Sequence, residues 1–138
     1  MTAAADRGAG AIAIALFAEI AAAAAPDEAA GLLAALGTRI ADAHPVTPAA
    51  TVGDLETQLA THFAALGWGG CTLTPTYHSL DITHRGAPRP VAAADWEAAF
   101  PALLAAVYAR WFALLGAPPG LLVSVVAVEG DVVRLRQG

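Results

Sequence analysis

The sequence predicts an α+β fold in which helices come first and a small antiparallel sheet forms in the second half. Residues 11–66 repeat apolar side chains every three or four positions, as amphipathic helices do. Residues 71–83 alternate like paired strands. After a further helical stretch, residues 121–128 form a mostly apolar run of strand length, and residues 132–136 alternate as the return strand. A glycine-rich turn at 67–70 marks the change of period. The expected order is three helices, a β-hairpin, a long helix and a second β-hairpin, with the sheet packed on the helices.

The first two helices are predicted from apolar spacing and from proline. The first covers residues 11–25. Pro26 suits the first position of the second helix, and the acidic Asp27 and Glu28 suit its positively polarised N-terminal end. The second helix should end before Pro45, because a residue that precedes proline avoids the helical region. The apolar stripes are Ile12, Leu16, Phe17 and Ile20 in the first helix, and Leu32, Leu33, Leu36 and Ile40 in the second.

The third helix has a start signal and a stop signal. Thr51 can cap it, with Asp54 three residues later, and Gly67 closes it. The first hairpin then pairs residues 71–76 with residues 77–83. The side chains expected to point inward from this hairpin are Leu73, Leu80 and Ile82.

The long helix follows a breaker-rich loop, and Asp95 is expected to cap it. Pro101 lies too far into the helix for a simple start, which predicts a kink or a short preliminary turn. Gly116 closes the helix, and a turn at 129–131 separates the last two strands. The broad apolar face of this helix comprises Phe100, Leu103, Leu104, Val107, Trp111 and Leu114.

The 138 residues fit one domain, at 11–138, with residues 1–10 as a flexible N-terminal arm. The chain is 57% hydrophobic and only 14% charged, which leaves few polar groups to cover its surface. This composition favours self-association, with oligomer interfaces covering apolar surface. The alternative is that the high alanine content reflects only biased codon usage.

The charge of the chain excludes some classes of partner. All its basic residues are arginine, and the net charge is −5, so nucleic acid is not an expected partner. The single cysteine, Cys71, excludes an internal disulfide. The apolar run at 11–25 resembles a signal peptide, but Glu19 and the continuation into a second helix favour a helix of the mature domain. No stretch reaches the length of a transmembrane span free of charges and breakers.

The residues that carry chemistry form no catalytic or metal-binding pattern. His44, His62, His78 and His84 match no ligand spacing, and two of them on one strand would lie about 20 Å apart. His78, Ser79 and Asp81 are the residue types of a nucleophile triad, but neighbours on a strand point to opposite faces. The prediction is therefore no catalytic residue, no metal and no cofactor.

The three tryptophans are candidates for stacking against sugar rings. Trp111 lies on the apolar face of the long helix and Trp68 lies in the glycine-rich turn, so a core position is favoured for both. For Trp96 the sequence favours neither a core position nor stacking against a sugar ring.

Two motifs resemble the D-subunit family of bacterial cellulose synthase. The first is Leu66-Gly67-Trp68-Gly69 leading into a strand, and the second is Val107-Tyr108-Ala109-Arg110-Trp111 late in the long helix. The family carries Asn-Trp-Gly in the turn and Leu-Tyr-Gly-Arg-Trp in the helix, so three positions here differ. Two shorter segments, at 15–20 and 81–84, resemble the family's first helix and a short strand ending near a histidine.

The resemblance implies a non-catalytic accessory protein of cellulose biosynthesis. The family forms a ring-like homo-octamer, a tetramer of dimers, whose N-terminal segments line passages for nascent β-1,4-glucan chains. Thr2, Asp6 and Arg7 are therefore the expected passage residues. Other subunits of the synthase complex are the expected partners. The implied location is cytoplasmic, at the inner-membrane complex, and the alternative is periplasmic.

The motif residues themselves are expected to serve the fold or an interface. These residues are Gly67, Trp68, Gly69, Tyr108, Arg110 and Trp111. For Arg110 the hypothesis is a salt bridge to an acid across a dimer contact.

A different class of function is an alternative. The predicted order of helices and strands also resembles domains of the 4-vinyl reductase type and of trafficking complexes. A member of that class would be a sensory or binding module that buries an apolar small molecule. An enzyme is the third interpretation, and it has no set of catalytic residues in its favour.

Overall fold

The computed structural model describes residues 12, 15–16, 18–20, 22, 25–87, 94–118 and 120–138, with the backbone alone at 94–98. The described residues at 12–22 are helical, in agreement with the predicted first helix. The remaining elements confirm the predicted α+β class and order. They are α2 (Pro26–Ala43), α3 (Val52–Leu66), β1 (Gly70–Pro75), β2 (Leu80–Arg85), α4 (Ala94–Leu114), β3 (Val123–Glu129) and β4 (Val132–Gln137).

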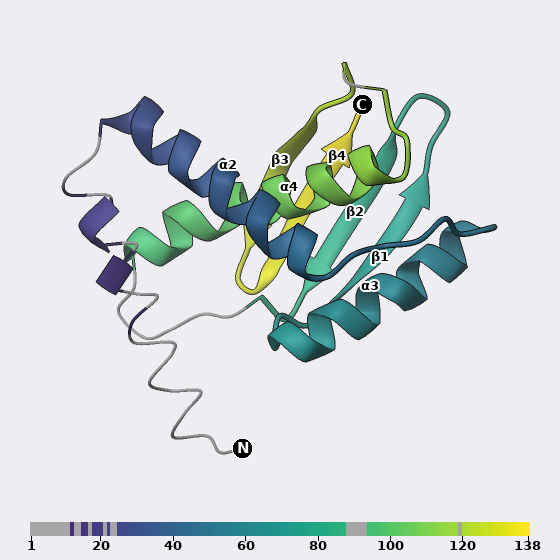
Figure 1. The fold of residues 1–138 in the computed structure, drawn as a ribbon, viewed down its shortest axis with the longest axis horizontal. Coiled ribbons are helices and arrows are strands. Elements are labelled where there is room, and N and C mark those ends of the chain that lie inside the picture. Colours follow the sequence, from purple (N-terminus) through teal and green to yellow (C-terminus); the bar gives the residue numbers. More distant parts are fainter. Residues whose placement is uncertain are drawn as a thin grey trace.

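The four strands form one antiparallel sheet in the order β1-β2-β4-β3 (Figure 1). The C-terminal strand β4 therefore lies inside the sheet, between β2 and β3, and the edges are β1 and β3. Ile82 on β2 pairs with Leu73 on β1 and with Leu135 on β4, and these three side chains are buried. The two hairpins predicted from sequence are thus joined by direct pairing of β2 with β4.

The described helices lie on one face of this sheet (Figure 1). Helix α4 packs against β3 and β4, α3 packs against β1, and α2 packs on α4. The core lies between α4, α3 and the sheet, and its largest fully buried side chains are Trp111, Tyr108, Phe63, Leu59, Ile82, Leu104, Leu135, His84, Val107 and Val133.

The helix ends follow the signals in the sequence. Pro26 begins α2, and its acidic residues lie in the first turn. The Thr51 hydroxyl accepts a hydrogen bond from the Asp54 N–H at 3.0 Å, which confirms the predicted cap of α3. Gly67 ends α3 in the left-handed conformation, with φ of 73°, as predicted.

The apolar stripe predicted for α2 is correct at Leu33, which is buried, and at Ile40, which packs against the core, but it was wrong at its other two residues. Leu32 and Leu36 are exposed, whereas the buried residues of this helix are Leu33, Gly37 and Ala41. The reason is a close crossing with α4, since a Cβ atom on Gly37 would lie 2.6 Å from the Cβ of Ala106. Small side chains let two helix backbones approach, so the contact face follows the small residues rather than the leucines. In the first helix Ile12 and Leu16 are also exposed.

The close crossing of α2 and α4 predicts different effects on stability for alanine substitutions at two glycines of α2. We expect Gly37→Ala to lower the free energy of unfolding by about 1–2 kcal/mol, because overpacking exceeds the gain in helix propensity. Gly31→Ala is the matched control, because a Cβ there meets nothing within 4 Å. It should raise the stability by roughly 0.5–1 kcal/mol. Urea denaturation of both variants measures the difference, and equal effects would contradict the close crossing.

Several element ends differ from the sequence prediction. The first hairpin turns over a wider loop, so His78 lies in the loop and shares no strand with His84. Tyr77, predicted on a strand, is 94% exposed in the same loop. Helix α4 begins at Ala94, so Asp95 lies inside the helix and not before it. The helix also continues through Pro101, without a separate preliminary turn, while Leu114 is exposed at its end.

Candidate functional site

The turn from Gly67 to Gly69 meets β2 and α4 at one place, where the two sequence motifs come together. The Trp68 N–H donates to the Phe63 carbonyl at 3.0 Å, which holds the turn against the end of α3. Gly69 has φ of 81°, and a Cβ atom there would lie 1.9 Å from the Arg85 carbonyl oxygen. Only glycine fits this close approach of two backbones. We call the contact of this turn with β2 and α4 the junction.

His84 is the polar centre of the junction. It is fully buried on β2, and its ring bonds two different elements. Its Nε2 lies 2.6 Å from the Trp68 carbonyl oxygen, and its Nδ1 lies 2.9 Å from the Tyr108 hydroxyl. The histidine therefore ties the turn, the sheet and α4 together.

The partners of His84 determine its tautomer. A carbonyl oxygen only accepts, so Nε2 carries the proton and donates it to Trp68. In the neutral ring Nδ1 is then an acceptor, and the Tyr108 hydroxyl donates to it. The Cys71 thiol on β1 also interacts with that hydroxyl. Three side chains from three elements thus form one chain of polar contacts that ends on the backbone of the turn.

Burial keeps the groups of this polar chain neutral. Desolvation lowers the pKa of His84 below its ordinary 6.5, and the hydrogen bond to Trp68 opposes this shift only in part. Burial raises the pKa of Cys71 to about 11, and the nearby Glu56 adds to the rise. Burial also raises the pKa of Tyr108 well above 10. A thiol with so high a pKa is an unreactive one at neutral pH.

Aromatic rings surround this polar chain. The Phe63 ring lies edge-on to His84, with 4.6 Å between ring centroids, and edge-on to Trp111 at 5.3 Å. The Trp68 ring contacts Phe100 on α4 at 5.1 Å. The structure thus places both motif tryptophans in the protein's own packing, Trp111 fully buried and Trp68 half-buried.

Trp111 also has a polar role. Its indole N–H donates to the carbonyl oxygens of Ala41, at 3.2 Å, and His44, at 2.9 Å. These carbonyls belong to the end of α2, where helices leave carbonyl groups without partners. The His62 ring stacks on Trp111, with 5.6 Å between ring centroids. Trp111 therefore anchors the end of α2 on α4.

Arg110 pairs with an acid of its own chain. Its Nε donates to the Asp42 carboxylate at 2.8 Å, which links α4 to α2 beside the Trp111 anchor. Both side chains are more than one third exposed, so the pair contributes little to stability. The salt bridge that we expected across a dimer contact has its partner within the chain.

The other candidate residues do not come together at the junction. Thr2, Asp6 and Arg7 lie outside the described residues, as does the side chain of Trp96. His44 and His62 are neighbours, with 5.6 Å between ring centroids, but His78 lies on an exposed loop. Within the described ranges no three His, Cys, Asp or Glu side chains gather as a metal ion requires. None of the helices in those ranges is long and apolar enough to cross a membrane.

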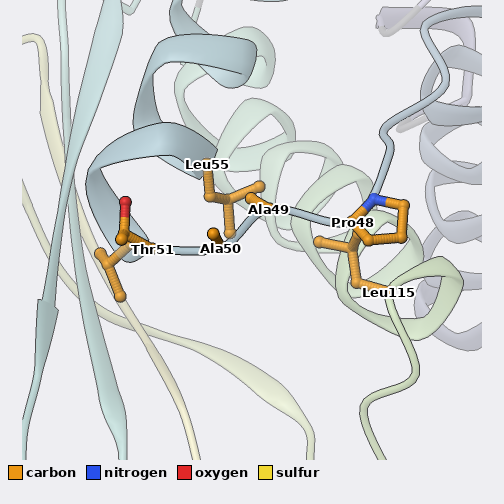
Figure 2. Close-up of a pocket in the computed structure, with 7 residues that line it drawn as sticks. Pro48, Ala49, Ala50, Thr51, Leu55 and Leu115 are labelled. Carbon is orange, nitrogen blue, oxygen red and sulfur yellow. The ribbon is translucent and has the colours of Figure 1, made fainter.

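An open hollow of about 320 Å³ lies away from the junction, where the loop before α3 meets the end of α4. Figure 2 shows Pro48, Ala49 and Ala50 along this loop, with Leu55 and Leu115 beside them. Thr51 supplies the one polar side chain of the lining, and its hydroxyl already caps α3. The hollow therefore offers apolar contact without a free side chain to orient a ligand.

Sequence reasoning missed the role of His84, which was considered there only as a possible metal ligand. The signal was its place two residues after Ile82 on the same strand, which gives both side chains the core face. Asp42 and Gly37 were also missed. For Gly37 the available signal was the spacing of Leu33, Gly37 and Ala41 by four residues.

The fold and the junction define a small α+β protein whose buried polar groups hold its own elements together. Every buried polar side-chain atom in the described part of the chain has a hydrogen-bond partner within it. The family model of the cellulose synthase D-subunit matches residues 11–138, which is nearly the whole chain. The chain therefore belongs to the D-subunit family of cellulose synthase, as its two motifs indicated. No curated protein matches it.

Membership of this family gives the chain a role in cellulose synthesis, as an accessory protein associated with the cellulose synthase complex. The motif residues that we singled out from the sequence lie at the junction or next to it, and their observed contacts are within the chain. Within the chain, the junction therefore holds the turn, β2 and α4 together.

Proposed function

We propose that this chain is a non-catalytic scaffold that forms a ring-like homo-oligomer and organises nascent β-1,4-glucan chains for export and crystallisation. The observation that carries the proposal is the amount of apolar surface on the folded chain. Leucine or valine side chains are about half exposed or more on α2 (Leu32), before β3 (Leu122) and on β3 (Val126). Soluble proteins cover such surface in assemblies.

The glucan contacts are assigned to the N-terminal arm rather than to the junction. Trp111 is fully buried and cannot stack against a sugar, and the half-buried Trp68 ring is partly covered by its contact with Phe100. The arm carries the polar residues Thr2, Asp6 and Arg7, which can form hydrogen bonds with glucan hydroxyl groups. In a ring, several copies of this arm would line the passages through which separate chains leave.

The arm can be tested apart from the assembly. We expect that deleting Met1 to Gly10 leaves the oligomer mass unchanged, as measured by light scattering on a size-exclusion column. Cellulose yield or fibre order should fall in cells that carry only this variant. A matched variant replaces the ten residues by glycine and serine, which keeps the length but removes the side chains. If both variants give wild-type cellulose yield and fibre order, the arm does not take part in the function.

A second candidate function rests on the hollow in Figure 2, whose volume is at the low end of ligand pockets. In this alternative the chain is a binding module for an apolar small molecule. Native mass spectrometry of the purified protein separates the two functions. A bound small molecule that is lost on substitution of Leu115 by arginine would favour the binding module.

A further inference from the structure

The two edges of the sheet differ in how they are covered. Helix α3 packs along β1, and the Glu56 carboxylate accepts a hydrogen bond from the Leu73 N–H of that strand. The backbone of the β1 edge is therefore partly satisfied from within the chain. An edge strand without such cover presents a row of free N–H and C=O groups to any other strand.

At the opposite edge, β3 pairs only with β4 among the described strands. Just before β3, the Leu122 carbonyl accepts from the Gly138 N–H, so the peptide groups of Leu122 face β4. The direction alternates along a strand, so the N–H and C=O groups of Val123 and Val125 point away from β4. These are the groups that a further strand would bond.

The side chains of β3 do not protect this edge. The strand reads Val-Ser-Val-Val-Ala-Val-Glu, with neither lysine, arginine nor proline among its seven residues. Three of its four valines are exposed, 40% at Val125, 53% at Val126 and 49% at Val128. The irregular pairing between Val125 and Ala127 and the charge of Glu129 at the strand end are the features of this strand that oppose further pairing. Natural edges that stay free usually carry charge or proline as well.

We propose that β3 is an interface between copies of this chain, at which the β3 strand of a second copy pairs with it in the antiparallel direction. Two four-stranded sheets then become one continuous sheet about a twofold axis. The inference rests on the homo-oligomer of the proposed function and assigns to it one contact surface. The partner strand would cover the free peptide groups of β3 and part of the surface of its valines.

A second copy fits this edge better than a charged partner strand does. The only charge on β3 is Glu129, at its end. Antiparallel self-pairing places Glu129 opposite the Val123 end of the partner, so the two acids stay apart. The whole chain carries a net charge of −5, which makes approach of two copies unfavourable over most of the surface. The neutral β3 edge is a place where that repulsion is weak.

The first test compares two arginine substitutions by light scattering on a size-exclusion column. Val126→Arg puts a positive charge on the exposed centre of β3, and we expect the oligomer mass to fall to half or less. Tyr77→Arg adds the same charge to the exposed loop between β1 and β2, and we expect the mass to be unchanged. A third variant, Leu32→Arg, tests the exposed face of α2 as the competing surface.

The outcomes separate this interface from the ring. If Val126→Arg leaves the oligomer mass unchanged, the β3 interface is wrong, but the ring-like oligomer is not contradicted. This holds whether or not Leu32→Arg dissociates the oligomer. A dimer that Val126→Arg converts to a monomer supports the interface while the ring fails. A monomeric wild-type protein overturns both the oligomer and the interface.

Amide hydrogen exchange supplies the second test, which does not depend on the total mass. In the wild-type oligomer the amides of Val123 and Val125 should exchange slowly, because the partner strand accepts from them. In Val126→Arg they should exchange roughly tenfold faster or more. The amides of Val133 and Leu135 on the inner strand β4 should keep their protection, which shows that the variant is folded. Fast exchange at Val123 and Val125 in the wild-type oligomer would overturn the proposal.

Discussion

Replacing Gly69 with alanine is expected to lower the free energy of unfolding by about 2–5 kcal/mol, a large part of the stability of a small domain. The backbone at this position has φ of 81°, which costs an L-residue about 1–2 kcal/mol. The added Cβ would also lie 1.9 Å from the Arg85 carbonyl oxygen and 2.8 Å from the Gly86 Cα. Both are backbone atoms, so the turn and β2 must move apart. Urea denaturation at one fixed protein concentration measures the change.

Gly67→Ala is the matched control for this prediction. Its φ of 73° imposes a similar backbone cost, but a Cβ at that position meets nothing within 4 Å. The expected loss is about 1 kcal/mol, because alanine also restricts the unfolded chain. The difference between the two variants reports the close approach of the turn to β2. Equal losses would show that this approach does not stabilise the fold.

The fold could be predicted from the sequence because its local signals are strong and agree with one another. The cap at Thr51 and the left-handed Gly67 fix the ends of α3, and Pro26 fixes the start of α2. The contact face of α2 was predicted only in part, because leucines define an apolar stripe only when the partner helix keeps an ordinary distance. The crossing at Gly37 is a property of two helices together, and single-helix periodicity contains no information about it.

The junction was predicted only in part, for a related reason. The two motifs singled out Trp68, Tyr108 and Trp111 as residues of the fold or of an interface, and each of them makes contacts within the chain. The polar centre that joins them, His84, is remote in sequence from both motifs. Its role depends on the pairing of β2 with β1 and β4, which places it beneath α4. The partner of Arg110 depends on the same kind of long-range contact, here between α4 and α2.

Acid is expected to destabilise the folded chain through His84. The pKa of this histidine is lowered by burial, whereas in the unfolded chain it lies near the ordinary 6.5. Unfolding therefore takes up a proton at pH values below about 6.5 and above the folded pKa. The contribution of His84 to the free energy of unfolding should be constant above this window and should fall inside it by about 1.4 kcal/mol per pH unit. Urea denaturation at a series of pH values measures the slope.

Protonation of His84 disrupts hydrogen bonds at the junction. With Nε2 already donating to Trp68, the new proton goes to Nδ1, which then has to donate to a Tyr108 hydroxyl that formerly donated to it. The hydroxyl must turn, and its contact with the Cys71 thiol changes as well. Phe63 packs on the same ring and offers no compensating charge. Acid should therefore loosen the attachment of the turn to α4 before it affects the sheet.

Two glutamine variants separate His84 from the other histidines. His84→Gln keeps a donor and an acceptor but does not titrate, so its stability should be nearly independent of pH in the window just below about 6.5. His78→Gln alters a histidine on an exposed loop and should keep the wild-type slope. If wild type and His84→Gln lose stability equally in this range, the buried histidine is not the group that responds. A slope that disappears only in His84→Gln would show that the motif turn, β2 and α4 depend on one neutral imidazole.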